Sequence, residues 1–209
     1  MECAQGGAGA CEDFYKESNI TALGAVALQS VSMAMRNGAL QKLEELELEN
    51  CTLSDGHVRG FADALKESGC AGRLTALVFV SCRVDVEGVR LLADLFSRGV
   101  FPALKCLDLE GNPNISDVGV MALAEALLKS TQTCLKTLGL KKVEMGDEGI
   151  STLASLALQG RLEHLAWLDI FENDDLTKQG IITLARAIDA RGLPMLEAFA
   201  MEEFGLRRQ

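Results

Sequence analysis

Leucine and other apolar residues recur along this chain in short alternating runs that return about every thirty positions. The first leucines of six such runs are separated by 31, 30, 31, 30 and 31 residues. These leucines are Leu43, Leu74, Leu104, Leu135, Leu165 and Leu196. Within a run, apolar and polar residues alternate, as in Leu46-Glu47-Leu48, and a period of two predicts a β-strand. The repetition predicts a stack of similar units.

A second apolar pattern follows the strand segments and has the period of a helix. Apolar residues stand at positions i, i+3, i+4 and i+7, for example at Val120, Leu123, Ala124 and Leu127, and this spacing forms one face of an α-helix. Each unit is therefore predicted to be one strand followed by one helix. Short polar residues that suit an N-cap stand where the helices should begin: Ser54, Asp85, Ser116 and Thr177.

The stacking of these units predicts the overall architecture. A single unit cannot cover its apolar side, so neighbouring units must share a core. Strands stack about 4.8 Å apart, whereas packed helices stay about 8–10 Å apart. We therefore expect an α/β fold: a right-handed solenoid curved into a horseshoe, with a parallel β-sheet on the concave face and α-helices on the convex face. The most apolar stretch, Thr21 to Met35, is too short and too polar to span a bilayer, so no membrane is expected as a partner.

The pattern also predicts how the chain is divided. Residues 1–13 are expected to be a flexible tail, and residues 14–209 the repeat domain. Within that domain we expect an incomplete opening unit over 14–39, five strand–helix repeats over about 40–192, and a terminal strand in 193–209. An early half-unit, in which Ile20 precedes the helix, belongs to the opening unit. The last run has no helix after it, so its edge strand is expected either to self-associate or to continue into a longer solenoid.

The turn after each strand completes a known signature. The residues at this turn are Cys51, Cys82, Asn112, Val143 and Asn173. The full pattern L-x-x-L-x-L-x-x-N/C-x-L resembles the ribonuclease-inhibitor-like class of leucine-rich repeats, over roughly residues 20 to 201. The resemblance implies the solenoid fold and a role in binding macromolecules, because the family includes inhibitors, GTPase-activating proteins, innate immune receptors and cytoskeletal or ciliary scaffolds. Val143 departs from the pattern, and its unit should lack one side-chain bond to the loop.

Charge and cysteine content restrict the partners and the compartment. The chain has 20 Lys and Arg residues against 30 Asp and Glu, a net charge of -10. An acidic chain repels phosphate backbones, so we expect no nucleic acid and favour a protein partner with a basic surface. The seven cysteines show no disulfide-like spacing, which indicates reduced thiols and a cytoplasmic location. Cys51 and Cys82 allow a metal or redox pair, but a structural role in the turn is favoured.

The residues between the inward leucines should point to the concave face and form the partner-binding site. Among them, Trp167 and Phe171 flank Asp169, and exposed aromatics beside charge resemble a binding hot spot. The alternative is that the two rings pack together or cover the last unit. The predicted partner-binding residues are Trp167, Asp169, Phe171, Glu45, Glu47, Glu49, Val78, Val80, Asp108, Glu110, Lys141 and Glu172.

Acidic residues dominate this predicted site. The ladder of Glu45, Glu47 and Glu49 is continued by Asp108 and Glu110. Like charges at neighbouring positions cost stability, so a basic partner is one reason for them. The alternative is a solvated face that aids solubility.

No pattern of catalytic residues stands out. The two histidines, His57 and His164, have no Cys, Ser or carboxylate at the spacing of a triad or a metal site. No glycine-rich phosphate loop follows a strand. We therefore expect no enzymatic activity, no cofactor and no metal. The sequence predicts a protein–protein interaction module or scaffold; the alternatives are a GTPase-activating type of regulator and a structural subunit of a cytoskeletal or ciliary assembly.

Overall fold

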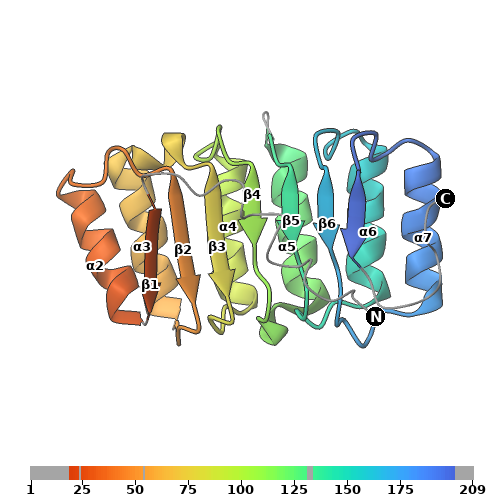
Figure 1. Cartoon of the computed structure of the whole chain (residues 1–209), viewed down its shortest axis with the longest axis horizontal. Helices are drawn as coiled ribbons and strands as arrows, with labels where there is room; N and C mark the ends of the chain where they lie inside the picture. The colour runs from red at the N-terminus through yellow and green to blue at the C-terminus, as the bar shows by residue number, and fades with distance from the viewer. Residues whose placement is uncertain (1–18, 24, 54, 131–133, 201–209) are drawn as a thin grey trace, which may run out of the picture.

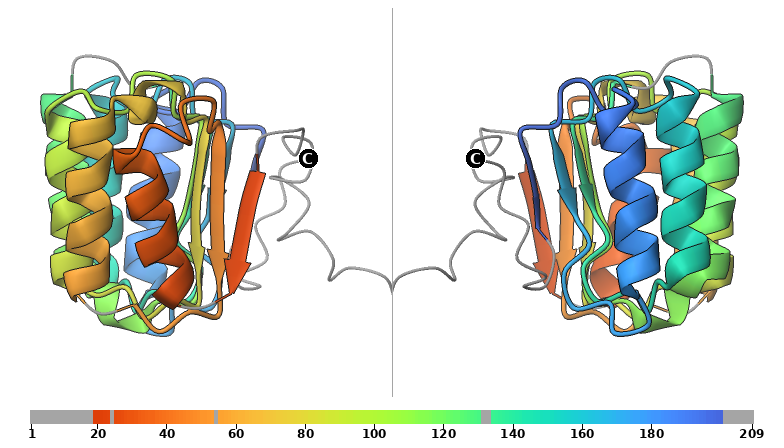
Figure 2. Two further views of the ribbon diagram at one scale, coloured as in Figure 1. Left: turned by 90° about the vertical axis from the view of Figure 1, so that its left-hand side faces the viewer. Right: turned by 90° about the vertical axis from the view of Figure 1, so that its right-hand side faces the viewer.

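A computed structural model describes residues 19–23, 25–53, 55–130 and 134–200, and shows two layers, a parallel β-sheet and a row of helices (Figures 1 and 2). The strands are β1 (Asn19–Leu23), β2 (Glu45–Glu49), β3 (Ala76–Val80), β4 (Cys106–Asp108), β5 (Thr137–Gly139), β6 (Trp167–Asp169) and β7 (Ala198–Ala200). The helices are α2 (Ala25–Arg36), α3 (Asp55–Ser68), α4 (Val86–Ser97), α5 (Ser116–Lys129), α6 (Asp147–Leu158) and α7 (Lys178–Asp189). Two 3-10 turns are η1 (Cys70–Arg73) and η2 (Pro113–Ile115). The predicted tail, residues 1–13, lies outside the described residues.

Every strand pairs in parallel with the next strand along the chain, so the sheet order is the sequence order. The second leucines of the repeats face each other across this ladder, as in the pairs Leu46 with Leu77 and Leu107 with Leu138. All four side chains are fully buried. The predicted stack of strand–helix units is thus confirmed, while its curvature into a horseshoe stays a prediction.

The shared core lies between the sheet and the helix layer. The predicted apolar face of α5 is buried there through Val120, Leu123 and Leu127. Phe61 of α3 meets Phe79 of β3 edge to face, with ring centroids 5.9 Å apart, an arrangement that aromatic pairs favour. The buried side chains of the helices and of the strands thus form one core.

The opening unit contains a strand as well as a helix. Asn19–Leu23 forms β1 and pairs with β2 in full register, from Asn19 with Glu45 to Leu23 with Glu49. The sequence pattern places Ile20 at the start of the helical half, but Ile20 lies in β1 and α2 begins at Ala25. The difference arises because one position separates this strand from its helix, whereas later units insert a longer loop.

Asn112 holds together the loops of two adjacent repeats. Its side chain is fully buried, and its Oδ1 accepts hydrogen bonds from the main-chain N–H groups of Cys82, at 3.0 Å, and Val84, at 2.9 Å. Its Nδ2 donates to the carbonyls of Phe79, at 2.6 Å, and Leu109, at 2.8 Å. One amide side chain thus satisfies main-chain groups that would otherwise be buried without partners.

Asn173 has the same role in a later repeat, and the turn residue between the two asparagines uses its main chain instead. The Oδ1 of Asn173 accepts from the N–H of Val143 at 3.1 Å. The carbonyl of Val143 accepts from the N–H of Ser116 at 2.8 Å, and the carbonyl of Cys82 accepts from Leu53 at 3.0 Å. From Cys82 onward, turns with an asparagine amide therefore alternate with turns that use a main-chain carbonyl, to which Cys82 adds a bond from its thiol to the Leu48 carbonyl.

Two of the predicted N-caps are confirmed. The Asp85 carboxylate accepts from the N–H of Gly88 at 2.9 Å, and the Thr177 hydroxyl accepts from Gln179 at 3.1 Å. Ser54 lies outside the described residues. The prediction for Ser116 is wrong: the N-cap of α5 is Ile115, without a side-chain cap bond. In this repeat η2, over Pro113–Ile115, leads the chain directly into the helix.

Carboxylates in the first turns of α5 and α6 also accept hydrogen bonds from the next repeat. Oδ1 of Asp117, in the first turn of α5, accepts from the N–H groups of Gly146 at 2.7 Å and Gly149 at 2.8 Å, at the start of α6. Asp147 of α6 accepts in the same way from the N–H and hydroxyl of Thr177, at 2.9 and 2.6 Å. These bonds lower the pKa of Asp147, and negative charge at a helix start is favourable. The repeats of α5 and α6 thus each help to begin the next helix along the chain.

Candidate functional site

The outer side of the sheet, opposite the helices, is called the sheet face here, and the strand register arranges it in rows. Side chains alternate along each strand, so the residues beside the buried leucines point away from the helix layer. The first row contains Glu45, Ala76, Cys106, Thr137 and Trp167, and the second contains Glu47, Val78, Asp108, Gly139 and Asp169. The third contains Glu49 and Val80, followed by the turn residues Glu110, Lys141, Phe171 and Glu172.

All twelve predicted partner-binding residues lie on this face or at the turns where its strands end. The expectation that they are exposed is wrong for three of them, because Glu45, Val78 and Asp169 keep only 6%, 5% and 4% of their surface accessible. The other nine are half-buried. Val78, of the second row, packs with Ala76 and Cys106 of the first row in a small apolar cluster, because side chains on one face of paired strands also lie close to their diagonal neighbours.

The turns after β4, β5 and β6 bring together two ammonium groups, those of Lys141 and Lys142, and two carboxylates. Lys142 Nζ lies 3.6 Å from a Glu172 oxygen. Lys141 Nζ lies 2.9 Å from a Glu110 oxygen and 3.4 Å from a Glu172 oxygen. The hydrogen bond to Glu110 is the main reason that the pKa of Lys141 is raised. Lys141 Nζ also lies 5.7 Å from the centroid of the Phe171 ring, within cation–π distance. Lys141 therefore links three of the predicted residues from the two neighbouring turns.

Asp108 and Asp169 lie on either side of Gly139 in the second row. Each uses its Oδ1 to accept a main-chain N–H two residues later, Asp108 from Glu110 at 2.9 Å and Asp169 from Phe171 at 3.0 Å. A Cβ at position 139 would lie 2.6 Å from Cγ of Asp108 and closer still to its Oδ1. Glycine at this position therefore leaves the space that the Asp108 carboxylate occupies.

The two aspartates have raised pKa values. Burial raises the pKa of Asp108 to about 6, and the charges of Glu110 and Asp169 act in the same direction. Burial also raises the pKa of Asp169, with further contributions from Glu110 and Glu172. An additional positive charge at this point of the sheet face would favour the ionised form of both carboxyl groups.

The two aromatic residues are half-buried and separate. The ring contacts among the described residues do not pair Trp167 with Phe171. Trp167 lies beside the smaller Thr137 in the first row, whereas Phe171 lies at the turn beside Lys141. The structure thus does not support the alternative in which the two rings pack on each other.

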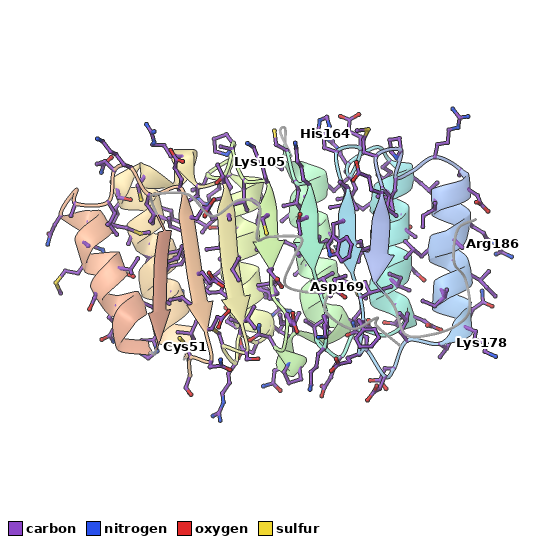
Figure 3. All side chains as sticks on the ribbon, viewed as in Figure 1. Cys51, Lys105, His164, Asp169, Lys178 and Arg186 are labelled. Atoms are coloured by element: carbon purple, nitrogen blue, oxygen red, sulfur yellow. The ribbon has the colours of Figure 1, made fainter. Side chains whose placement is uncertain are left out.

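Two lysines at the opposite edge of the sheet face were not predicted as site residues. Lys105 and Lys136 directly precede β4 and β5, and the N–H of Lys136 donates to the carbonyl of Lys105 at 2.7 Å. Among the described residues, neither ammonium group forms an ion pair. Figure 3 shows Lys105 at the upper edge of the sheet and Asp169 near the lower ends of the strands. Comparing the residue before each strand across the repeats would have shown this pair of lysines.

The cysteines at the turns have a structural environment. Cys51, Cys70, Cys82 and Cys106 are buried thiols, and Cys134 is an exposed one; the described residues contain no disulfide. The Cys82 thiol donates to the Leu48 carbonyl at 3.2 Å, and burial raises its pKa to about 12. Within the described ranges, no group of three or more His, Cys, Asp or Glu residues is placed to hold a metal ion.

Cysteine labelling tests this environment. We expect iodoacetamide to modify Cys134 in the folded chain and to leave Cys82 unmodified until urea unfolds it, since the thiolate is the reactive form. Peptide mapping by mass spectrometry after a short exposure reports each cysteine separately. Modification of Cys82 at the rate of Cys134 under native conditions would contradict its described burial.

The described helices show no candidate for a membrane span, and the longest of them, α3 and α5, have 14 residues.

Strand–helix units of 30 and 31 residues, stacked through leucines and linked by buried turn residues, define an α/β repeat protein. Residues 102–124, which include β4 and the beginning of α5, match a family model described as Leucine Rich repeat. The chain is also 33% identical over 155 residues to the mouse protein "NACHT, LRR and PYD domains-containing protein 5", an alignment that covers 74% of this chain and 13% of that relative. The chain is a leucine-rich repeat protein.

Proposed function

We propose that this chain is a protein-interaction module that binds a protein partner on its sheet face. One observation supports this most directly: Trp167 and Phe171 lie half-buried on the same face as a charged cluster in which carboxylates outnumber ammonium groups. Aromatic side chains that are partly held in place and surrounded by charge are typical of binding hot spots. The leucine-rich repeats, and a relative whose printed name includes LRR, are consistent with a non-catalytic binding role.

The sheet face is suited to binding because its side chains are fixed before a partner arrives. Asp108 and Asp169 are held by main-chain N–H groups, and Lys141 is held by Glu110 and Glu172. Side chains that are already ordered lose little conformational freedom on binding, so more of the contact energy appears as affinity. A scaffold of paired strands supplies this order more readily than a loop does.

The charge of the face favours a partner with basic side chains. Four carboxylates, those of Asp108, Glu110, Asp169 and Glu172, outnumber the two ammonium groups of Lys141 and Lys142, and the whole chain carries a net charge of -10. Opposite charge on the partner would speed association and select against acidic competitors. We also propose a cytoplasmic location, which fits the five cysteine thiols of the described chain.

The Trp167→Ala substitution tests the proposed function. The partner is first captured with the whole chain as bait, and its dissociation constant is measured by calorimetry. We expect Trp167→Ala to weaken binding at least about tenfold, which corresponds to about 1.4 kcal/mol, because it removes a large apolar contact. The circular dichroism spectrum should remain that of the unmodified chain.

Ile182→Ala is the matched control, since Ile182 is an exposed apolar side chain on α7, in the helix layer. Its dissociation constant should equal that of the unmodified chain. A partner whose affinity falls with Ile182→Ala and is unchanged by Trp167→Ala would place the binding surface on the helices and contradict the proposal.

A further inference from the structure

We propose that the sheet face binds a polypeptide segment with both signs of charge, its acidic group at Lys105 and Lys136 and its basic group at the half-buried carboxylates of Asp108, Glu110 and Glu172. This inference rests on the proposed function. It adds the charge pattern of the partner and its orientation, with the acidic group where the strands begin and the basic group where they end. It follows from three features: a basic edge, an acidic edge, and the neutral surface between them.

The basic edge lies where the strands begin. Lys105 and Lys136 occupy equivalent positions in adjacent repeats, immediately before Cys106 and Thr137, which are register partners. Parallel pairing keeps such neighbours about 4.8 Å apart in the main chain, and the hydrogen bond from Lys136 N to Lys105 O confirms the proximity. Neither ammonium group forms an ion pair in the described chain, so a carboxylate from a partner would find two lysines in adjacent repeats to pair with.

The acidic edge lies where the same strands end. Asp108, Glu110, Asp169 and Glu172 carry four negative charges against the two positive charges of Lys141 and Lys142. A lysine or arginine side chain from a partner would reduce this excess. A metal ion is the less suitable ligand, because no group of three or more ligating residues is placed to hold one in the described ranges.

The surface between the two edges is neutral and sets the spacing of the partner's charges. Its residues are Cys106, Thr137 and Trp167, the first residues of β4, β5 and β6. Cys106 and Thr137 are buried, so the half-buried Trp167 offers the accessible side chain. Three residues separate Lys105 from Asp108 along the strand, a distance of about 10 Å at 3.3 Å per residue. A partner can place its two charges this far apart over about three residues of extended chain, or about seven residues of helix. Trp167 then contacts the segment between its charged groups.

A peptide-display selection on the whole folded chain tests this inference. The probe is a random library of displayed peptides of about 15 residues, long enough to span 10 Å in either conformation. Binders are selected on the unmodified chain and counter-selected on Trp167→Ala, so that only sequences that use the sheet face remain. We expect the enriched peptides to contain acidic and basic residues in separate groups.

Two double variants then test whether Lys105 and Lys136 bind the acidic group of the selected peptides. In Lys105→Glu/Lys136→Glu, peptides selected on the unmodified chain should bind about tenfold more weakly, and a new selection should lose the acidic group. The control is Lys178→Glu/Arg186→Glu, which makes the same change in net charge on α7 (Figure 3) and should bind the original peptides unchanged. Thermal unfolding of both variants verifies that they fold.

The outcomes separate this inference from the proposed function. Enriched peptides that are purely basic, or an equal loss of binding in both double variants, overturn the two-sign pattern and leave a basic partner on the sheet face as proposed. If no peptide survives counter-selection on Trp167→Ala, both the two-sign pattern and the proposed role of the sheet face are overturned.

Discussion

Asn112→Ala should lower the free energy of unfolding by about 3–5 kcal/mol, because it leaves several buried main-chain groups without partners at about 1–3 kcal/mol each. The lost acceptor serves the N–H groups of Cys82 and Val84, and the lost donor serves the carbonyls of Phe79 and Leu109. All of these groups lie in the closed loop between two repeats, where replacement by water needs space that the packed core does not offer. Urea unfolding followed by circular dichroism measures the change.

Asn114→Ala is the control for this experiment, since Asn114 is exposed in η2, two positions away. Its effect should stay within about 0.5 kcal/mol, as is usual for surface substitutions. A loss below about 1 kcal/mol for Asn112→Ala would mean that the buried amide is not the link between repeats that its hydrogen bonds indicate.

Asp108→Asn should raise the free energy of unfolding by about 2–3 kcal/mol at about pH 7.5, an estimate that follows from a shift of the Asp108 pKa from 3.8 to about 6. A carboxyl group whose pKa is raised in the folded state binds its proton more tightly there than in the unfolded chain. Its contribution is therefore fully present below about pH 4 and is lost as the pH rises to 6. Asparagine keeps the acceptor for the Glu110 N–H and carries no charge to desolvate.

The prediction is tested by measuring the unfolding free energy of both proteins between about pH 4 and pH 7.5. The two curves should approach each other at low pH and separate above about pH 6. Asp94→Asn should change the unfolding free energy in the opposite direction. The hydrogen bond from Arg98 lowers the pKa of Asp94, so this variant should be less stable than the unmodified chain at neutral pH. A constant difference between Asp108→Asn and the unmodified chain across the whole range would contradict the raised pKa.

The repeating fold could be predicted because the same burial requirement acts in every unit. Each of the six leucine runs contains a strand, and Leu46, Leu77, Leu107 and Leu138 are buried as their spacing indicates. β1 was missed as a strand because its short link to α2 does not follow the spacing of the later units. The N-cap at Ser116 was wrong because η2 runs directly into α5, so that Ile115 takes the N-cap position.

The candidate site could be predicted only in outline. Alternation along a strand assigns residues to the sheet face, and all twelve predicted residues lie there or at its turns. Alternation does not reveal what the neighbouring strands contribute, so the burial of Val78 and Asp169 was not foreseen. The space that Gly139 leaves for the Asp108 carboxylate, and the pairing of Lys105 with Lys136, depend on the register between repeats.

The alternation of the turn residues has a consequence for how this protein can be shortened or extended. Asn112 and Asn173 are 61 residues apart, and the unit between them closes its neighbour's loop through a main-chain carbonyl. Excising a single unit there would set two asparagine-type turns next to each other, so that register and loop length no longer match. A block of two units restores both, which makes the pair of repeats, and not the single repeat, the natural module for deletion, duplication or grafting within this solenoid.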